Sequence, residues 1–249
     1  MVNFDPLNIY FDKIFVVTLA RSGNRQAHIN KALAGLRYEF FWGADKNELS
    51  IEELTEKNIY NEALAVAHHR YNKPMNHGQI GCALSHKNIY AEIIDKGYAR
   101  TLILEDDVEP IAEAIALFPE ISGEAPKDWE MLYMDYSKNE NNNVFKKYWY
   151  HLQRLGGGLK WDHTIIDHLY PKQLSPHLST AGFHDYTDAY AVTLSGAKKL
   201  YNLQSPVSYV ADNLLAIAAT SKKVNALIIR PKLFRQLSQG DSTTFDSLL

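Results

Sequence analysis

One short segment constrains the fold of this chain more than any other. Residues 101–110 read T-L-I-L-E-D-D-V-E-P, an aliphatic run that ends in three consecutive acids. A run of this length is typical of a buried strand in an α/β sheet, and such sheets bind ligands beyond the carboxyl ends of their strands. We therefore expect an α/β fold with Glu105, Asp106 and Asp107 at the rim of a pocket.

Three neighbouring carboxylates repel one another and are costly to remove from water. A hard divalent cation, which prefers oxygen ligands, is the most natural compensation. The alternative is a solvated acidic turn that caps the following helix. From these ten residues both interpretations are open, and the cation site has the larger functional consequence.

Other segments repeat the alternation of strand and helix. We expect strands at residues 13–19, 38–42, 130–135, 189–194 and 224–229. We expect helices at residues 22–34, 50 onward, 78–97, 111–118 and 195–203, with Ser22, Ser50 and Ser195 as N-caps and Gly97 as a stop. Asp45 and Asp135 each follow a predicted strand, so both are expected on the acidic rim.

Residues 136–181 differ from the rest of the chain in character. They hold an Asn run, three consecutive glycines at 156–158 and scattered aromatic residues. The glycines lack the Lys-Ser or Lys-Thr ending of a phosphate-binding loop, so a lid or hairpin is the better interpretation. We expect long loops or a small insertion within a single domain of residues 1–249.

Charge and cysteine content exclude several classes of protein. A net charge of −3 leaves no general footprint for nucleic acid, although residues 222–235 are locally basic and suit an anionic substrate or a membrane surface. Cys82 is the only cysteine, which rules out an internal disulfide and a cysteine-rich zinc site. We expect a cytoplasmic protein, with at most peripheral contact at the inner face of the cytoplasmic membrane.

Three sequence blocks follow one another in a distinctive order. They are I-F-V-V-T-L at 14–19 with Arg21, Asn24 and Arg25; G-Q-I-G-C-A-L-S-H at 78–86 followed by L-E-D-D at 104–107; and A-Y-A-V at 189–192 with S-G-A-K-K-L at 195–200, Pro206 and Asp212. In this order the blocks resemble glycosyltransferase family 25, which includes bacterial lipooligosaccharide galactosyltransferases and animal collagen galactosyltransferases. The resemblance covers most of residues 13–236 and leaves 136–181 unmatched.

The resemblance implies a GT-A-like, Rossmann-type mixed sheet flanked by helices. It also implies an inverting transfer of a hexose, galactose from UDP-galactose, onto a lipooligosaccharide or lipopolysaccharide acceptor. In such folds an acidic motif holds Mn²⁺ or Mg²⁺ and the donor. Because side chains alternate along a strand, Asp107 and Glu105 are assigned to the metal, Glu105 also to the ribose, and Asp106 to the donor.

The resemblance also suggests donor and catalytic residues. Its donor-binding set is Thr18, Leu19, Arg21, Arg25, Asp45, Ser85, Glu105 and Asp106. The arginines would contact diphosphate or uridine, and the alternative for each is a solvated arginine on a helix face. An inverting transfer needs a base, for which Asp212 and Asp188 are the candidates, with Asp212 preferred by its position in the family pattern.

Two residues in the matched blocks depart from the family pattern. Gln79 stands where Glu is usual, and Lys46 where the loop usually has Gly. We interpret Gln79 as a helix-entry residue, because Gln keeps the hydrogen bonds of Glu and loses only the charge. His86 can hydrogen-bond the acidic rim or simply pack within its helix, and Cys82 is expected to be a small core residue.

Other functions remain open from the sequence. A receiver-type signalling domain also ends a strand in adjacent acids, but that strand opens the domain, whereas here about a hundred residues precede it. A phosphohydrolase of the D-x-D-x-T type is a weaker fit because these acids are contiguous. A non-catalytic protein that binds carbohydrate or nucleotide sugar on the same fold is the third alternative.

Overall fold

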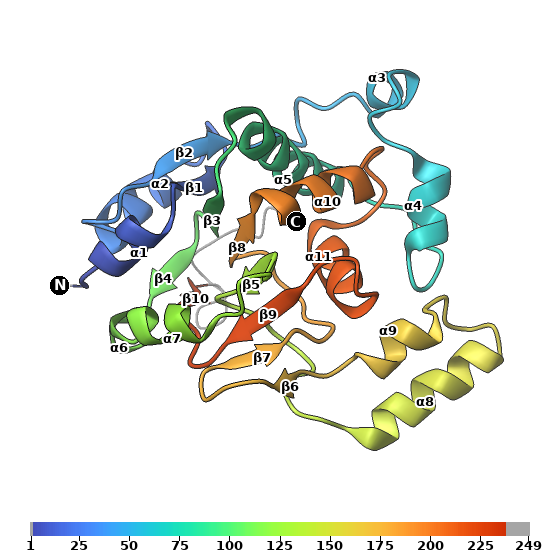
Figure 1. The fold of residues 1–249 in the computed structure, drawn as a ribbon. Helices are drawn as coiled ribbons and strands as arrows, with labels where there is room; N and C mark the ends of the chain where they lie inside the picture. The colour runs from blue at the N-terminus through green and yellow to red at the C-terminus, as the bar shows by residue number, and fades with distance from the viewer. Residues whose placement is uncertain (1, 238–249) are drawn as a thin grey trace.

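The computed structural model describes residues 2–237. The strands are β1 (Lys13–Thr18), β2 (Glu39–Trp42), β3 (Arg100–Glu105), β4 (Val108–Pro110), β5 (Met131–Tyr133), β6 (Lys172–Gln173), β7 (Leu178–Thr180), β8 (Ala189–Thr193), β9 (Ala226–Ile229) and β10 (Phe234–Gln236). Eight of them form a mixed sheet in the order β2-β1-β3-β8-β5-β9-β7-β6, and β10 pairs with β4 separately. The expected mixed α/β sheet is confirmed (Figure 1).

The direction of the strands decides where the site lies. β2, β1 and β3 are parallel, whereas β8 runs antiparallel to both of its neighbours, β3 and β5. In this register Ala189, at the start of β8, pairs with Leu104, near the end of β3. The chain that leads into β8 therefore reaches the same edge of the sheet as the acids that follow β3.

Helices cover both faces of the sheet. They are α1 (Asp5–Tyr10), α2 (Gly23–Ala32), α3 (Ile51–Glu56), α4 (Glu62–His68), α5 (His77–Lys96), α6 (Ala112–Ala116), α7 (Phe118–Glu124), α8 (Val144–Leu155), α9 (His163–Asp167), α10 (Leu194–Leu203) and α11 (Ala211–Thr220). One face packs on α1, α2, α6 and α7, and the other on α5, α10 and α11 (Figure 1). The sheet is thus the middle of three layers.

The apolar run in β3 contributes to both cores. Leu102 and Leu104 join the core beside α1 and α2, while Ile103 joins the core beside α5 and α11. All three side chains are fully buried. This explains why the strand is continuously aliphatic: successive side chains point to opposite faces, and helices cover each face.

The helix ends follow two of the four expected signals, Ser50 and Gly97. Ser50 caps α3 by accepting a hydrogen bond from the backbone N–H of Glu53, and Gly97 ends α5 in the left-handed region at φ 69°. Ser22 precedes α2 without making a side-chain cap. The expectation for Ser195 is wrong, because Thr193 caps α10.

Residues 136–181 are more regular than expected. They contain α8 and α9, and β7 pairs with β9, so the segment extends the central sheet. The glycines at 156–158 follow the end of α8, where Gly157 adopts a positive φ of 73°, and they do not line the acidic pocket. Of the two expectations, a small insertion describes the segment better than long loops, because it contains two helices and two short strands.

No helix within residues 2–237 is both long and apolar enough to cross a membrane.

Candidate functional site

A cavity of about 440 Å³ lies where β1, β2 and β3 end. Such a volume lies within the range of small-molecule sites. The start of α5, the segment before β8 and the start of α11 complete its walls. Parallel strands meet an antiparallel one at this point, so the sheet leaves a crevice beyond their ends.

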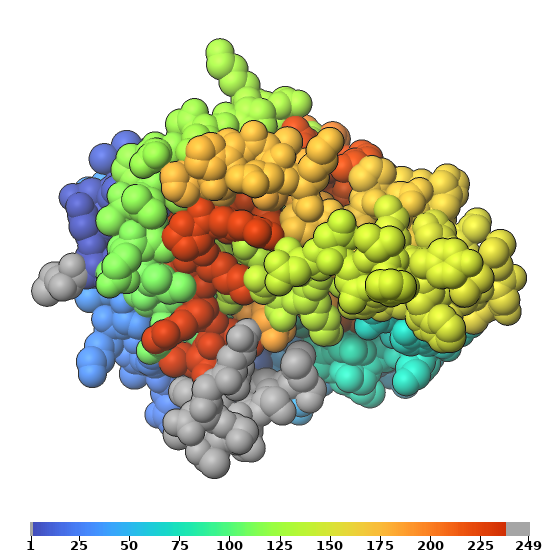
Figure 2. Space-filling model, turned by 90° about the horizontal axis from the view of Figure 1, so that it is seen from below, coloured from blue at the N-terminus to red at the C-terminus, as the bar shows by residue number. Residues whose placement is uncertain are grey.

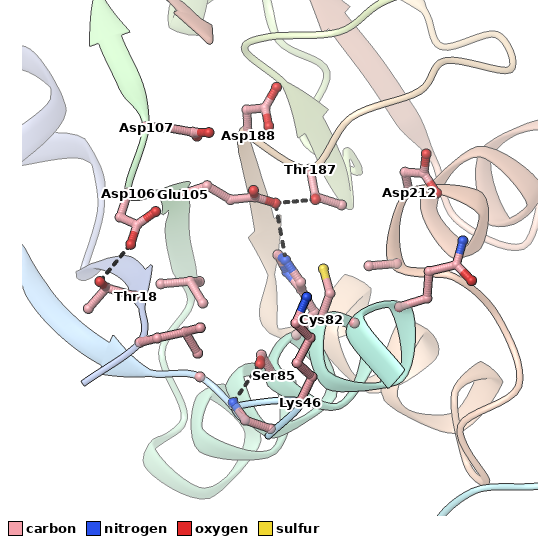
Figure 3. A pocket seen from close by; sticks show the side chains of 18 of the residues that line it. Thr18, Lys46, Cys82, Ser85, Glu105, Asp106, Asp107, Thr187, Asp188 and Asp212 are labelled. Atoms are coloured by element: carbon pink, nitrogen blue, oxygen red, sulfur yellow. Dashed lines mark hydrogen bonds and ion pairs between the residues drawn. The ribbon is translucent and has the colours of Figure 1, made fainter. Parts of the chain in front are cut away.

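Among the three consecutive acids, Asp106 points toward Thr18, whereas Glu105 and Asp107 point to the other side (Figure 3). Asp106 accepts hydrogen bonds from Thr18 Oγ1 at 2.6 Å and Arg25 Nη1 at 2.7 Å. Glu105 accepts a hydrogen bond from Thr187 on the opposite side. Asp107 lies near Glu105 and not near Thr18, the partner of Asp106. Strand alternation predicts this arrangement, with Glu105 and Asp107 on one side and Asp106 on the other.

A second segment completes a cluster of carboxylates. Oxygen atoms of Glu105, Asp107 and Asp188 lie within 4.8 Å of one another. Among the described residues, nothing hydrogen-bonds the buried atoms Asp107 Oδ1 and Asp188 Oδ2. Burial raises the pKa of both aspartates, and the Glu105 carboxylate raises them further. Three hard oxygen ligands with two unsatisfied atoms fit a divalent cation such as Mn²⁺ or Mg²⁺.

Glu105 is held by a buried hydrogen-bonded network. His86 Nε2 lies 3.6 Å from Glu105 Oε1, and His86 Nδ1 lies 2.7 Å from the Tyr190 hydroxyl. Tyr90 extends this chain, with 2.8 Å between the two hydroxyls. Burial opposes ionisation of Glu105, but the interaction with His86 and the hydrogen bond from Thr187 outweigh it and lower the pKa. His86 therefore fixes the orientation and charge of Glu105.

Two arginines face the cavity from the segment after β1. Arg25 pairs with Asp106 and lies 3.6 Å from Asp107, with only 15% of its side chain exposed. It is therefore not a solvated helix-face arginine. Arg21 pairs with Asp45, and this hydrogen bond lowers the pKa of Asp45. Asp45 itself does not line the cavity.

Ser85 holds one wall of the cavity in place. Its hydroxyl donates to the Gly81 carbonyl at 2.7 Å and accepts from the Ala44 backbone N–H at 2.8 Å. The loop after β2 is thereby fixed to α5. Lys46 on that loop lines the cavity together with Thr18, the last residue of β1, and Leu19, which follows it. Ser85, which the sequence analysis assigned to donor binding, thus shapes the pocket by holding the loop after β2 in place.

Asp212 occupies the first turn of α11 and lines the cavity. Figure 3 shows it set apart from Asp107 and Asp188. Burial raises the pKa of Asp212 to about 6, and the nearby Asp185 carboxylate contributes. Asp135, expected on the same rim, does not line the cavity; it is buried, 3.7 Å from Lys232 Nζ.

Gln79 has the structural role expected of it. Asn76 caps α5 by accepting a hydrogen bond from the Gln79 backbone, and the Gln79 side chain accepts one from the Asn76 N–H at 3.0 Å. This is a reciprocal capping box, in which Gln and Glu serve equally well. The loss of a charge at this position therefore leaves the helix entry intact.

Three residues at the site escaped the sequence analysis. Thr187 binds Glu105, and Gln236 donates to Asp107 Oδ2 at 3.3 Å. Tyr186 lines the cavity with φ at 85°, a left-handed conformation that is uncommon for a bulky residue. The sequence around these residues, just before β8 and on β10, shows no motif that would identify them. Only strand pairing brings them close to the acids.

The fold and the site together define a class of protein. Buried carboxylates that fit a cation lie beside two arginines at the crevice of a mixed α/β sheet. Arginine is the residue type that most often binds phosphate, and α/β sheets bind nucleotides at such crevices. The class is therefore an α/β protein with a site suited to an anionic nucleotide ligand. Residues 11–215 match the family described as glycosyltransferase family 25 (LPS biosynthesis protein), and the chain belongs to this family. The family resemblance noted in the three sequence blocks is confirmed.

Several relatives are similar at low identity. Procollagen galactosyltransferase 2 of Mus musculus is 26% identical over 204 residues, covering 78% of this chain and 28% of that protein. A glycosyltransferase 25 family member of Anopheles gambiae is 28% identical over 196 residues, covering 77% and 28%. The human inactive glycosyltransferase 25 family member 3 is 26% identical over 204 residues, covering 78% and 29%. The chain spans less than a third of the length of these relatives.

Among solved structures, the apo form of mouse xyloside xylosyltransferase 1 is 12% identical, with a TM-score of 0.41. The match covers 90% of this chain and 84% of that one.

Proposed function

We propose that this chain transfers galactose from UDP-galactose, with inversion, to a lipooligosaccharide or lipopolysaccharide acceptor. The observation that carries the proposal is the cluster of Glu105, Asp107 and Asp188 in a cavity that also holds Asp212. The description of the family as an LPS biosynthesis protein supports the acceptor class. The galactosyltransferase named among the relatives supports the sugar.

The donor side of the site follows from the carboxylates and arginines. Asp107 and Glu105, joined by Asp188, would hold Mn²⁺ or Mg²⁺, which when bound would neutralise the negative charge of the departing diphosphate. Arg21 and Arg25 both line the cavity, which supports a role for them in binding phosphate oxygens. Arg25 already balances Asp106, so it can keep that partner or exchange it for the donor's phosphate.

The base is best assigned to Asp212. A single displacement requires a group that removes the proton from the acceptor hydroxyl on the side opposite the leaving group. Asp188 is the weaker candidate because its carboxylate belongs to the cation cluster, whereas Asp212 stands apart on α11. A pKa of about 6 suits a general base, since the carboxylate is ionised at neutral pH yet more basic than an exposed aspartate.

A second candidate function is binding without catalysis. One observation favours it: a relative that matches 78% of this chain is named an inactive family member. In that case the same cavity would bind a nucleotide sugar or carbohydrate and turn nothing over.

A donor screen separates the two functions. The full chain is incubated with Mn²⁺ and, in separate reactions, UDP-galactose, UDP-glucose and UDP-N-acetylhexosamines, while UDP release and the melting temperature are measured. We expect UDP-galactose both to raise the melting temperature and to release UDP, faster when an oligosaccharide acceptor is present. Stabilisation without UDP release under any condition would favour the binding protein. Neither effect with any donor would refute both the transferase and a protein that binds these nucleotide sugars.

A further inference from the structure

The helix α8 exposes an unusual apolar surface, and none of its residues lines the acidic cavity. Phe145 is 90% exposed, Tyr148 65%, Trp149 58% and Leu155 78%. With Leu152, which is 43% exposed, they fall at spacings of three and four residues, so they form one stripe along the helix. We call Phe145, Tyr148, Trp149, Leu152 and Leu155 the α8 stripe. A stripe of this kind marks an interaction site on a water-soluble surface.

The polar side of α8 faces the protein. Lys147 Nζ lies 3.3 Å from Asp167 Oδ1, and His151 Nε2 lies 3.4 Å from the same atom. Lys146 donates to Asn139 Oδ1 at 2.9 Å. Together with the packing of Tyr150 on Trp161, these contacts orient the helix with the α8 stripe outward. Figure 2 shows α8, in yellow-green, on the outside of the molecule.

The charged residues nearest to the stripe in the sequence are basic, and the neighbouring Asp167 is paired with Lys147 and His151. Residues 141–161 contain Lys146, Lys147, Arg154 and Lys160 and no acid, although the chain as a whole has a net charge of −3. The backbone N–H of Lys160 donates to the Arg70 carbonyl, which places another basic segment next to this one. The apolar stripe is therefore flanked by cations at an end of the molecule.

We propose that α8 docks the protein on an anionic lipid surface. Phe145 and the leucines would enter the acyl boundary, and the amphipathic rings of Tyr148 and Trp149 would lie at the level of the headgroups. Arg154 and Lys160 would contact the anionic headgroups. A second copy of the chain is a poorer occupant, because pairing two such helices would bring like charges together.

The position of α8 connects this surface to the cavity. Lys146 binds Asn139, which donates to the Phe183 carbonyl, three residues before Tyr186 in the cavity wall. A protein docked through α8 would hold that wall close to the membrane, where a lipid-linked acceptor is found. The docking inference itself stands on the exposed stripe and does not depend on the proposed transfer reaction.

Vesicle binding tests the docking surface. The full chain is sedimented with phosphatidylcholine vesicles, with and without phosphatidylglycerol, across a range of salt concentrations. We expect binding to the anionic vesicles that weakens with salt. The double substitution Phe145→Ser with Trp149→Ser should weaken it about tenfold or more, and Arg154→Glu with Lys160→Glu should act mainly at low salt. Because these side chains are exposed, the melting temperature should not change.

Two controls make the outcome specific. Ile9 is 82% exposed on α1, so Ile9→Ser removes an equally exposed apolar residue elsewhere and should leave binding unchanged. Brominated acyl chains should quench the fluorescence of Trp149, and Trp149→Phe should remove this quenching while binding persists.

Three results would overturn the proposal. The first is no binding to anionic vesicles, and the second is equal binding by the Phe145→Ser, Trp149→Ser variant. The third is a stable dimer in light scattering that this variant dissociates, since the stripe would then bind a second copy.

Discussion

At the scale of single residues, the site is an arrangement of carboxylates with different partners. Asp106 is satisfied by Thr18 and Arg25, whereas Asp107 and Asp188 each keep a buried oxygen with no partner among the described residues. An unsatisfied buried carboxylate raises the free energy of the folded state. Its persistence here is the physical argument for a bound cation.

The substitution Asp107→Ala tests this argument. Loss of a cation ligand should lower Mn²⁺-dependent turnover on the order of 1000-fold, equivalent to several kcal/mol of transition-state stabilisation. The melting temperature without metal should stay the same or rise, because a poorly solvated carboxylate is removed. Turnover is measured by UDP release and stability by thermal unfolding. Asp95→Ala, at an exposed aspartate with 71% of its side chain accessible, is the control. Retained Mn²⁺-dependent turnover would refute the metal assignment.

The pH dependence of the rate tests Asp212. Its carboxylate can accept a proton only when ionised, and burial raises its pKa to about 6. The rate with saturating donor should therefore be constant well above pH 6 and fall about tenfold per pH unit well below it. Asp212→Asn should remove this pH dependence and lower the rate roughly 100- to 10,000-fold, while the affinity for the donor stays unchanged. Weakened donor binding in Asp212→Asn would instead indicate a donor-side role.

At the scale of elements, α5 positions more of the site than any other helix. Its capping box at Asn76 and Gln79 fixes where the helix begins, and Ser85 and His86 reach the loop after β2 and Glu105. Gly81 allows the loop to approach, because a Cβ at this position would lie 2.7 Å from the Ala44 carbonyl oxygen. The cavity wall therefore depends on a close contact between backbone and helix.

The substitution Gly81→Ala tests this contact. The added methyl group must displace the loop, so we expect destabilisation of about 1–3 kcal/mol and weaker donor binding. Gly123→Ala, within α7, is the matched control: a Cβ there meets nothing within 4 Å, and alanine favours helix. Urea unfolding and donor titration measure both effects. Equal stability of the two variants would show that the loop tolerates displacement.

At the scale of the whole molecule, the insertion is joined to the body by both sheet and core. β7 pairs with β9, and Ala216 of α11 packs in the same cluster as Trp161 and Ile166. The two main cores share every central strand, since alternate side chains of one strand enter each of them. These connections favour a single cooperative unit.

We predict one thermal transition for the full chain. In calorimetry the van't Hoff enthalpy should equal the measured enthalpy, as for a two-state domain. A separate early transition would show that residues 136–181 unfold independently, and the single-domain prediction would then be wrong. The substitution Ala216→Asp, at a fully buried position between α11 and the insertion, should lower the transition temperature of the whole protein.

Local sequence patterns determined the elements of this protein well. The aliphatic run ending at Glu105, the helix stop at Gly97 and the cap at Ser50 each depend on neighbouring residues only, so they could be predicted. Family motifs then predicted which acids belong to the site. Residues 136–181 were harder, because the Asn run and the glycines at 156–158 indicate loops, although the apolar residues of α8 between them fall at helical spacing.

Only the tertiary structure decided which acids meet. The sequence predicted a strand after Asp188 but not its direction, since the periodicity of a strand is the same whether it pairs parallel or antiparallel. β8 runs antiparallel, so the start of this strand lies at the end of β3 and Asp188 joins Glu105 and Asp107. Residue types and local order were set by the chain alone, whereas the cation cluster was set by strand pairing between segments more than eighty residues apart.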